Sequence, residues 1–196
     1  MWCRARADID AMTTGAIIFL AVLALAVVWA VLAYNALVQS RNKVDEAWSG
    51  IDVQLKRRHD LVPNLVETVK GYAAHESQTL LGVTEARQRA VEADGPEESE
   101  HAEGKLTRAL GQINALAESY PQLRAADNFQ RLQAELAEIE DEIQAARRIY
   151  NANVQNYNTR IQVFPTLLIA APMSFTARRF FEVEVPAERA VPSVAF

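Results

Sequence analysis

Residues 16–34 read AIIFLAVLALAVVWAVLAY, and no charged side chain occurs from position 11 to position 40. In a helix that rises 1.5 Å per residue, about twenty apolar residues span the roughly 30 Å hydrocarbon layer of a bilayer. A cleaved signal peptide and the buried helix of a soluble protein are the alternatives. A signal peptide has a shorter apolar region followed by a cleavage site, whereas this run continues as YNALV at 34–38 without Gly or Pro. The stretch therefore predicts an uncleaved transmembrane helix over residues 16–38, embedded in the lipid bilayer.

The charges that flank this segment predict its orientation. Trp29 and Tyr34 lie toward its C-terminal end, where aromatic rings sit at headgroup level. Before it, residues 1–15 form a leader with Arg4 and Arg6, and a start at Met12 is an alternative to Met1. After it come Arg41, Lys43, Lys56, Arg57 and Arg58. By the positive-inside rule this excess, although narrow, places the C-terminal domain in the cytoplasm and the anchor in the inner membrane.

Composition limits what the rest of the chain can be. The 196 residues are long enough for one domain, and half of them are hydrophobic. The formal net charge is −5, with Lys and Arg scattered among acids, so the basic footprint of a nucleic-acid-binding protein is missing. Cys3 is the single cysteine, which excludes an internal disulfide.

Apolar residues recur every three or four positions along most of the remaining sequence. The first series is Val44, Trp48, Ile51, Leu55, Val62, Leu65, Val69 and Tyr72, with one seven-residue step across Arg58. This spacing predicts an amphipathic helix with a coiled-coil-like seam. Pro63 lies within it and predicts a kink in one long helix, or else a short break and restart.

Two further helices are predicted. One covers residues 99–119, after a loop at 93–98 that contains Gly95-Pro96, and it ends at Tyr120-Pro121. The other begins near Asp127, which can cap it, and runs to Pro165. Stripes of this kind are buried only against one another. We expect an all-α fold: a transmembrane helix, an antiparallel up-and-down helical bundle over residues 39–165, and a tail at 166–196 that is irregular and partly mobile beyond Pro172, with a candidate extended segment at 180–185.

The sequence offers no catalytic constellation. His59, His75 and His101 lack the spacing of a metal site and are interpreted as solvated. The acidic residues between 92 and 103 are interpreted as a solvated, mobile turn, and those at 135–142 as the solvated face of a helix. No phosphate-binding glycine loop or nucleophile motif occurs. We therefore expect no enzyme activity, no cofactor, no metal and no small-molecule substrate.

Polar residues within the predicted helices are candidates for contacts between helices. Lys56-Arg57-Arg58 is expected to pair with acidic faces of neighbouring helices, within the domain or across a subunit interface. For the asparagines, capping with solvent contact and buried hydrogen bonding between helices both remain open.

Several ordered motifs resemble the LemA family of bacterial membrane proteins: IDVQLKRR at 51–58, DLVPNLV at 60–66, VKGYA at 69–73, ESYP at 118–121 and AARRIYN at 145–151. The resemblance covers roughly residues 16–181, and the leader departs from it. It implies a single-pass membrane helix followed by a bundle, with no established enzymatic activity, and its magnetosome relatives are linked to membrane organisation. Within or beside these motifs, the candidate interaction residues are Arg41, Asn42, Trp48, Asp52, Lys56, Arg57, Arg58, Asn64, Tyr72, His75, Arg147, Tyr150 and Asn151.

Two functional hypotheses follow from one anchor, a bundle and no reactive cluster. The first is a non-catalytic scaffold or assembly protein that forms a homo-oligomer or docks another membrane protein. The alternative is a receptor or signalling accessory protein, which requires a pocket with convergent polar groups, from Asn64, His75 or Tyr150. A hydrolase or metalloenzyme is the least favoured hypothesis.

Overall fold

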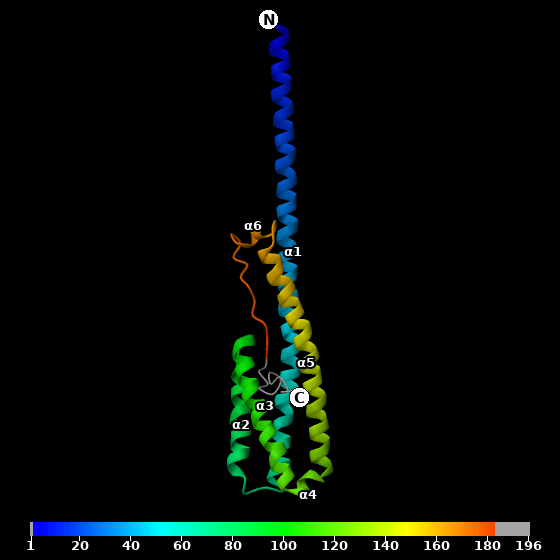
Figure 1. The fold of residues 1–196 in the computed structure, drawn as a ribbon, viewed down its shortest axis with the longest axis vertical. Coiled ribbons are helices and arrows are strands. Elements are labelled where there is room, and N and C mark those ends of the chain that lie inside the picture. Colours follow the sequence, from blue (N-terminus) through cyan, green and yellow to red (C-terminus); the bar gives the residue numbers. More distant parts are fainter. Residues whose placement is uncertain (1, 183–196) are drawn as a thin grey trace, which may run out of the picture. The chain divides into compact units, whose positions relative to one another are not determined.

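The computed structural model describes residues 2–182, with side chains described from residue 15 onward. This part of the chain is helical and contains no strand. Its elements are α1 (Trp2–Lys70), α2 (Ser77–Glu92), α3 (Gly95–Ser119), α4 (Pro121–Arg124), α5 (Asp127–Gln162) and α6 (Leu167–Ala170) (Figure 1). The predicted all-α class, with an apolar N-terminal helix followed by further helices, is confirmed.

The chain divides into two compact units, and both α1 and α5 contribute to each. The anchor unit comprises Met1–Lys43 and Asn156–Ala177, and the bundle unit comprises Val44–Gln155 together with the segment that begins at Arg178. The boundaries predicted from the sequence for the membrane helix and the bundle stay predictions.

The anchor unit contains the apolar part of α1. Within the described residues, α1 is the one helix long and apolar enough to cross a membrane. Large side chains such as Phe19, Leu25 and Leu32 are more than 60% exposed, as expected of a lipid-facing surface. Further along α1 in the same unit, Ala33 and Leu37 are buried.

The bundle unit places the later part of α1 with α2, α3 and the first part of α5. Figure 1 shows that consecutive long helices alternate in direction, and α2 packs along α3. The apolar positions predicted from residues 44–72 are mostly buried: Val62, Leu65 and Val69 are fully enclosed. They pack in one core with Val83 of α2, Leu106 and Ile113 of α3, Leu123 of α4, and Phe129 and Leu132 of α5.

The predicted loop at 93–98 is shorter than expected, because α3 begins at Gly95 and not at residue 99. Gly95 has a φ of +73°, which glycine adopts without steric cost. Pro96 falls in the first turn, where its missing N–H has no helical acceptor to satisfy, and Glu97 and Glu98 face the positive end of the helix dipole. The Gly-Pro pair therefore starts the helix here, and only residues 93 and 94 remain between α2 and α3.

Pro63 lies inside α1, which continues to Lys70, so the prediction of one long helix is confirmed and the alternative of a break is wrong. A proline has no N–H to donate to the carbonyl four residues earlier, which here belongs to His59. The Nε of Arg87 on α2 donates to that carbonyl oxygen at 2.7 Å. A side chain from the neighbouring helix thus replaces the missing backbone donor.

Residues 171–182 contain no helix, as expected for the tail. They are not all loosely attached, however, because Phe181 is fully buried in the bundle unit. Residues 183–185 of the candidate extended segment at 180–185 lie outside the described residues, and residues 180–182 form no strand.

Candidate functional site

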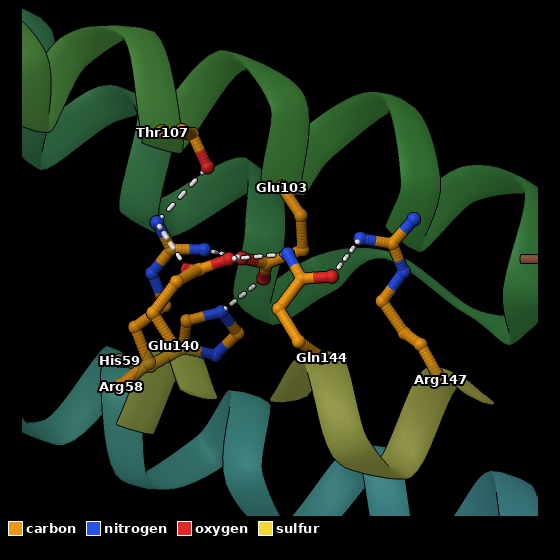
Figure 2. Close-up of polar contacts among 7 residues, drawn as sticks. All are labelled: Arg58, His59, Glu103, Thr107, Glu140, Gln144 and Arg147. Atoms are coloured by element: carbon orange, nitrogen blue, oxygen red, sulfur yellow. Dashed lines mark hydrogen bonds and ion pairs between the residues drawn. The ribbon is translucent and has the colours of Figure 1, made fainter. Parts of the chain in front are cut away.

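A cluster of polar side chains lies inside the bundle unit. It consists of Arg58 and His59 on α1, Glu103 and Thr107 on α3, and Glu140 and Gln144 on α5; we call it the polar cluster (Figure 2). The side chains of Arg58 and His59 are 8% and 9% exposed, and that of Glu103 is 1% exposed. Charged groups are rarely this buried unless they are paired.

Glu103 lies at the centre of the polar cluster. One carboxylate oxygen is 2.5 Å from Nε2 of His59, and the other accepts from Nη1 of Arg58 at 3.1 Å. Nη2 of Arg58 donates to Oγ1 of Thr107 at 2.9 Å and lies 3.5 Å from a carboxylate oxygen of Glu140. Three helices are therefore joined through a single guanidinium group.

The polar cluster continues along α5 toward Arg147. Gln144 donates from Nε2 to Oε1 of Glu140 at 3.1 Å, and its own Oε1 accepts from Nη1 of Arg147 at 3.1 Å (Figure 2). The Nε of Arg147 is buried and has no hydrogen-bond partner among the described residues. The guanidinium carbon of Arg147 lies 5.7 Å from the centre of the Phe181 ring, a distance at which a cation is attracted to an aromatic face.

The arrangement pairs the buried charged groups with one another. The Nε2 atom of His59 faces one oxygen of Glu103, and Arg58 donates to the other. Both oxygens of Glu103 are engaged. Among the described residues, no group of three or more metal-binding side chains could hold an ion.

A cavity of about 470 Å³ adjoins the polar cluster. Arg58, Thr107, Glu140 and Gln144 line one part of it, and the remaining walls include Leu65, Leu110, Gly111, Asn114, Gln133, Leu136 and Ala137. This is the size range of small-molecule sites, with a few polar groups among apolar ones.

The second feature of the bundle unit is the segment 178–182, which we call the strap. The Phe181 ring meets Trp48 edge-on, with ring centroids 5.3 Å apart, and Trp48 in turn meets Tyr150 at 5.7 Å. The side-chain amide of Asn151 both accepts from the backbone N–H of Phe181 at 2.9 Å and donates to its carbonyl at 3.1 Å. Tyr150 donates its hydroxyl to the carbonyl of Arg179 at 2.9 Å.

Two arginines of the strap form ion pairs with the helices of the bundle unit. Arg178 lies 3.1 Å from a carboxylate oxygen of Asp45, and Arg179 lies 2.6 Å from one of Glu97. Both pairs are largely exposed, so each contributes little to stability. The strap is held mainly by the buried Phe181 and the backbone contacts of Asn151.

Two tyrosines of the bundle unit have shifted pKa values. Burial raises the pKa of Tyr150, and the Asp45 carboxylate adds to the rise while Arg178 opposes it. Partial burial raises the pKa of Tyr120, as does the carboxylate of Glu76, to which its hydroxyl donates at 3.2 Å. In both cases the neutral hydroxyl is favoured.

The structure brings together some of the sequence-predicted residues. Arg58 joins the polar cluster, as expected of its pairing with acidic faces, while Trp48, Arg147, Tyr150 and Asn151 contact the strap. Of the asparagines, Asn64 is exposed, whereas Asn151 is partly buried and hydrogen-bonds to the backbone of Phe181 in the strap and not to another helix. The other candidates form no common site and are exposed: Arg41, Asn42, Asp52, Lys56, Arg57, Tyr72 and His75.

Two interpretations of acidic and histidine residues were wrong at particular positions. His59 is buried and not solvated, and Glu103 belongs to the core of α3 and not to a mobile acidic turn. Glu140 is 41% exposed at its side chain and also lies 3.5 Å from Arg58, a contact that the sequence did not indicate for this residue. A signal for the first two was present: residues 58 and 59 fill the gap in the seam between Leu55 and Val62, and Glu103 lies between Ser99 and Leu106 at helical spacing.

These features define a membrane-associated protein in which an apolar helix precedes a helical bundle with a paired, buried polar cluster. The LemA family matches residues 47–196 of this chain, which therefore belongs to that family. The chain is 28% identical to the Magnetosome protein MamQ of Magnetospirillum gryphiswaldense over 180 residues, which cover 79% of this chain and 66% of MamQ. It is also 28% identical to Protein LemA of Metamycoplasma hominis over 137 residues, covering 69% of this chain and 63% of that protein. The chain thus spans about two thirds of the length of these relatives.

Proposed function

We propose that this protein is a non-catalytic, membrane-anchored scaffold whose bundle assembles with further copies or with another membrane protein. The observation that carries the proposal is the closed pairing of the polar cluster. Glu103 of α3 engages both Arg58 and His59 of α1, and Arg58 also lies 3.5 Å from Glu140 of α5. These contacts hold the three helices in place and give the bundle a defined shape. A bundle surface of defined shape, anchored to a bilayer, is suited to binding a partner protein.

Two further observations support this proposal. Large apolar side chains remain exposed on the bundle unit, including Val53 of α1 and Ile149 of α5, which are 56% and 61% exposed. The names of the MamQ and LemA relatives describe no catalytic activity, and MamQ is named for the magnetosome. We place the anchor in the inner membrane and the bundle in the cytoplasm because of the flanking positive charges.

Photo-crosslinking in membranes at native expression tests the scaffold. A photoreactive residue replaces Val53 or Ile149, and two differently tagged copies are expressed together. An adduct that carries both tags identifies a homo-oligomer, and an adduct of constant mass with one tag identifies a fixed partner. The matched control replaces the exposed Glu118. Monomer alone at both test positions would overturn the proposal.

A ligand-binding receptor is the second candidate, and the cavity beside the polar cluster favours it. Its polar lining differs from the sequence prediction: Arg58, Thr107, Glu140 and Gln144 line it, whereas Asn64, His75 and Tyr150 do not. Gly111 lines the cavity, and a Cβ atom at this position would meet no atom within 4 Å. Gly111→Leu therefore fills the cavity with little strain. A scaffold keeps its crosslinking pattern in this variant, while a ligand-controlled receptor changes it.

A further inference from the structure

Residues 163–175 of the anchor unit carry a group of exposed apolar side chains. Phe164 is 79% exposed, Leu168 63% and Met173 58%, and Val163 and Leu167 are nearly half exposed. No charged residue occurs between positions 163 and 177. Scattered single apolar residues are normal on a surface, but a contiguous group marks an interaction site.

This segment contacts α1 close to the end of its apolar run. The ring of Phe175 meets Tyr34 edge-on, with centroids 5.8 Å apart, and the guanidinium carbon of Arg41 lies 5.7 Å from the centre of the same ring. Figure 1 shows α6 beside α1 within this unit. Tyr34 is the last residue of the apolar run, and Arg41 is the first charged residue after it. The segment is therefore positioned at the level where α1 leaves the hydrocarbon layer.

The charges near the segment match a lipid surface. Residues 35–43 and 156–177 of the anchor unit contain Arg41, Lys43 and Arg160 but no Asp or Glu. Cations near a membrane surface are attracted to anionic headgroups. A protein partner would have to be apolar and lie directly beside the membrane helix, which is where the bilayer itself is found.

Most backbone N–H groups of the segment form hydrogen bonds within it, as an environment poor in water requires. The amides of residues 167–171 and 173–175 all donate to carbonyl groups within residues 163–171, at 2.9–3.4 Å, and residue 172 is a proline. The hydroxyl of Thr166 donates to the carbonyl of Val163 at 3.0 Å. Few backbone donors of this segment would lose a hydrogen bond on leaving water.

We propose that residues 163–175 form a second membrane contact, lying in the headgroup region of the bilayer beside α1. Phe164, Leu168 and Met173 insert toward the acyl chains, while Arg41 and Arg160 remain among the headgroups. Unlike the spanning helix, this contact lies in the plane of the interface. It holds α1 at one depth and one rotation, which a single apolar helix does not do by itself.

Depth-dependent fluorescence quenching tests the contact in the full chain. Cys3→Ser removes the native thiol, and Leu168→Cys introduces one label site for an environment-sensitive fluorophore. The labelled protein is placed in nanodiscs of neutral and anionic phospholipid that carry a nitroxide either near the headgroup or near the chain end. Insertion to about 5–10 Å predicts blue-shifted emission and at least about twofold stronger quenching by the shallow nitroxide than by the deep one.

Leu81→Cys on α2 is the matched control, because Leu81 is 59% exposed and belongs to the bundle unit. It should show unshifted emission and little quenching at either depth. Phe164→Cys repeats the measurement, so that the result does not depend on one label. Blue-shifted emission without lipid quenching would identify a protein contact and overturn the proposal. Stronger quenching by the deep nitroxide, or no difference from Leu81, would overturn it as well.

Discussion

The polar cluster and the strap both fasten α5 within the bundle unit, but by different physics. The polar cluster buries charged groups on α1 and α3, which depend on each other, and joins them to the half-exposed Glu140 on α5. The strap is a short segment that packs against helices of the bundle unit through one buried ring and a few hydrogen bonds. The polar cluster therefore couples three helices of the bundle unit, while the strap can open locally.

The largest expected effect comes from breaking the polar cluster on one side. Glu103→Gln removes the buried negative charge that pairs with Arg58, and breaking a buried ion pair by removing one partner costs about 3–5 kcal/mol. Urea denaturation of the full chain in nanodiscs, followed by circular dichroism, should show this loss in the free energy of unfolding. Glu118→Gln on the exposed face of α3 should change the same quantity by no more than about 0.5 kcal/mol.

A triple variant separates charge compensation from packing. Arg58→Met with His59→Leu and Glu103→Leu removes the three most deeply buried polar side chains of the polar cluster, including its buried ion pair. Replacement of a buried ion pair by apolar side chains is often neutral or stabilising by about 1–4 kcal/mol. A triple variant as unstable as Glu103→Gln would show that the polar contacts themselves, and not the unpaired charge, supply the stability.

The strap should respond locally and somewhat less. Phe181→Ala removes a fully buried ring. It should reduce the stability of the attached strap by about 3 kcal/mol, the lower end of the range for buried Phe→Ala changes. Because the strap can detach while the helices stay folded, trypsin cleavage after Arg178 and Arg179 should accelerate by about 100-fold. The adjacent Phe180 is 44% exposed and provides the control. Equal acceleration by Phe180→Ala, or loss of helix content in Phe181→Ala, would contradict local opening.

A smaller effect is expected at the hydrogen bond from Arg87 to the carbonyl of His59, beside the polar cluster. Arg87→Leu leaves the carbonyl of His59 without a donor, which should cost about 1–3 kcal/mol. Pro63→Ala restores the backbone donor, so Arg87→Leu should cost about 1 kcal/mol less in that background. The double-mutant cycle measures this coupling in the free energy of unfolding. Additive effects would mean that Arg87 does not substitute for the missing N–H.

The smallest effect is the pH dependence of the strap. The folded-state pKa of Tyr150 lies above its ordinary value of 10.0. Its stabilising contribution is therefore complete below about pH 10 and is lost as pH rises through the folded-state pKa. At pH 8 the free energy of unfolding of the wild type should exceed that of Tyr150→Phe by about 1 kcal/mol, the contribution of one hydrogen bond. This difference should disappear at alkaline pH. A constant difference between the two proteins from pH 8 to 12 would contradict this linkage.

Much of the fold could be predicted because helical periodicity reports burial directly. The apolar seam from Val44 to Val69 and the long helix after Asp127 were both predicted, and Pro63 was placed correctly inside one helix. Gly95-Pro96 was interpreted as a loop because the two residues break helices in the interior, whereas at the first turn they start one.

The site was harder to predict, and for two physical reasons. His59 and Glu103 are polar, so residue type suggested solvent even where the helical spacing suggested burial. The strap shows no periodicity, and Asn151 recognises the backbone groups of Phe181, which every residue except proline possesses. Hydrogen bonds from a side chain to backbone groups, such as those of Asn151, are therefore hard to predict from the sequence.

Pro63 has a further consequence for how the bundle unit finds its correct alignment. Pro63 leaves the carbonyl of His59 without a backbone donor at one position along α1. Arg87 of α2 donates to this carbonyl. If α2 slipped by one turn, about 5.4 Å, Val83 or Val91 would stand opposite that oxygen, and neither side chain can donate a hydrogen bond. A residue that usually disrupts helices thus selects the register between two of them and disfavours the misaligned packings that similar apolar stripes would otherwise allow.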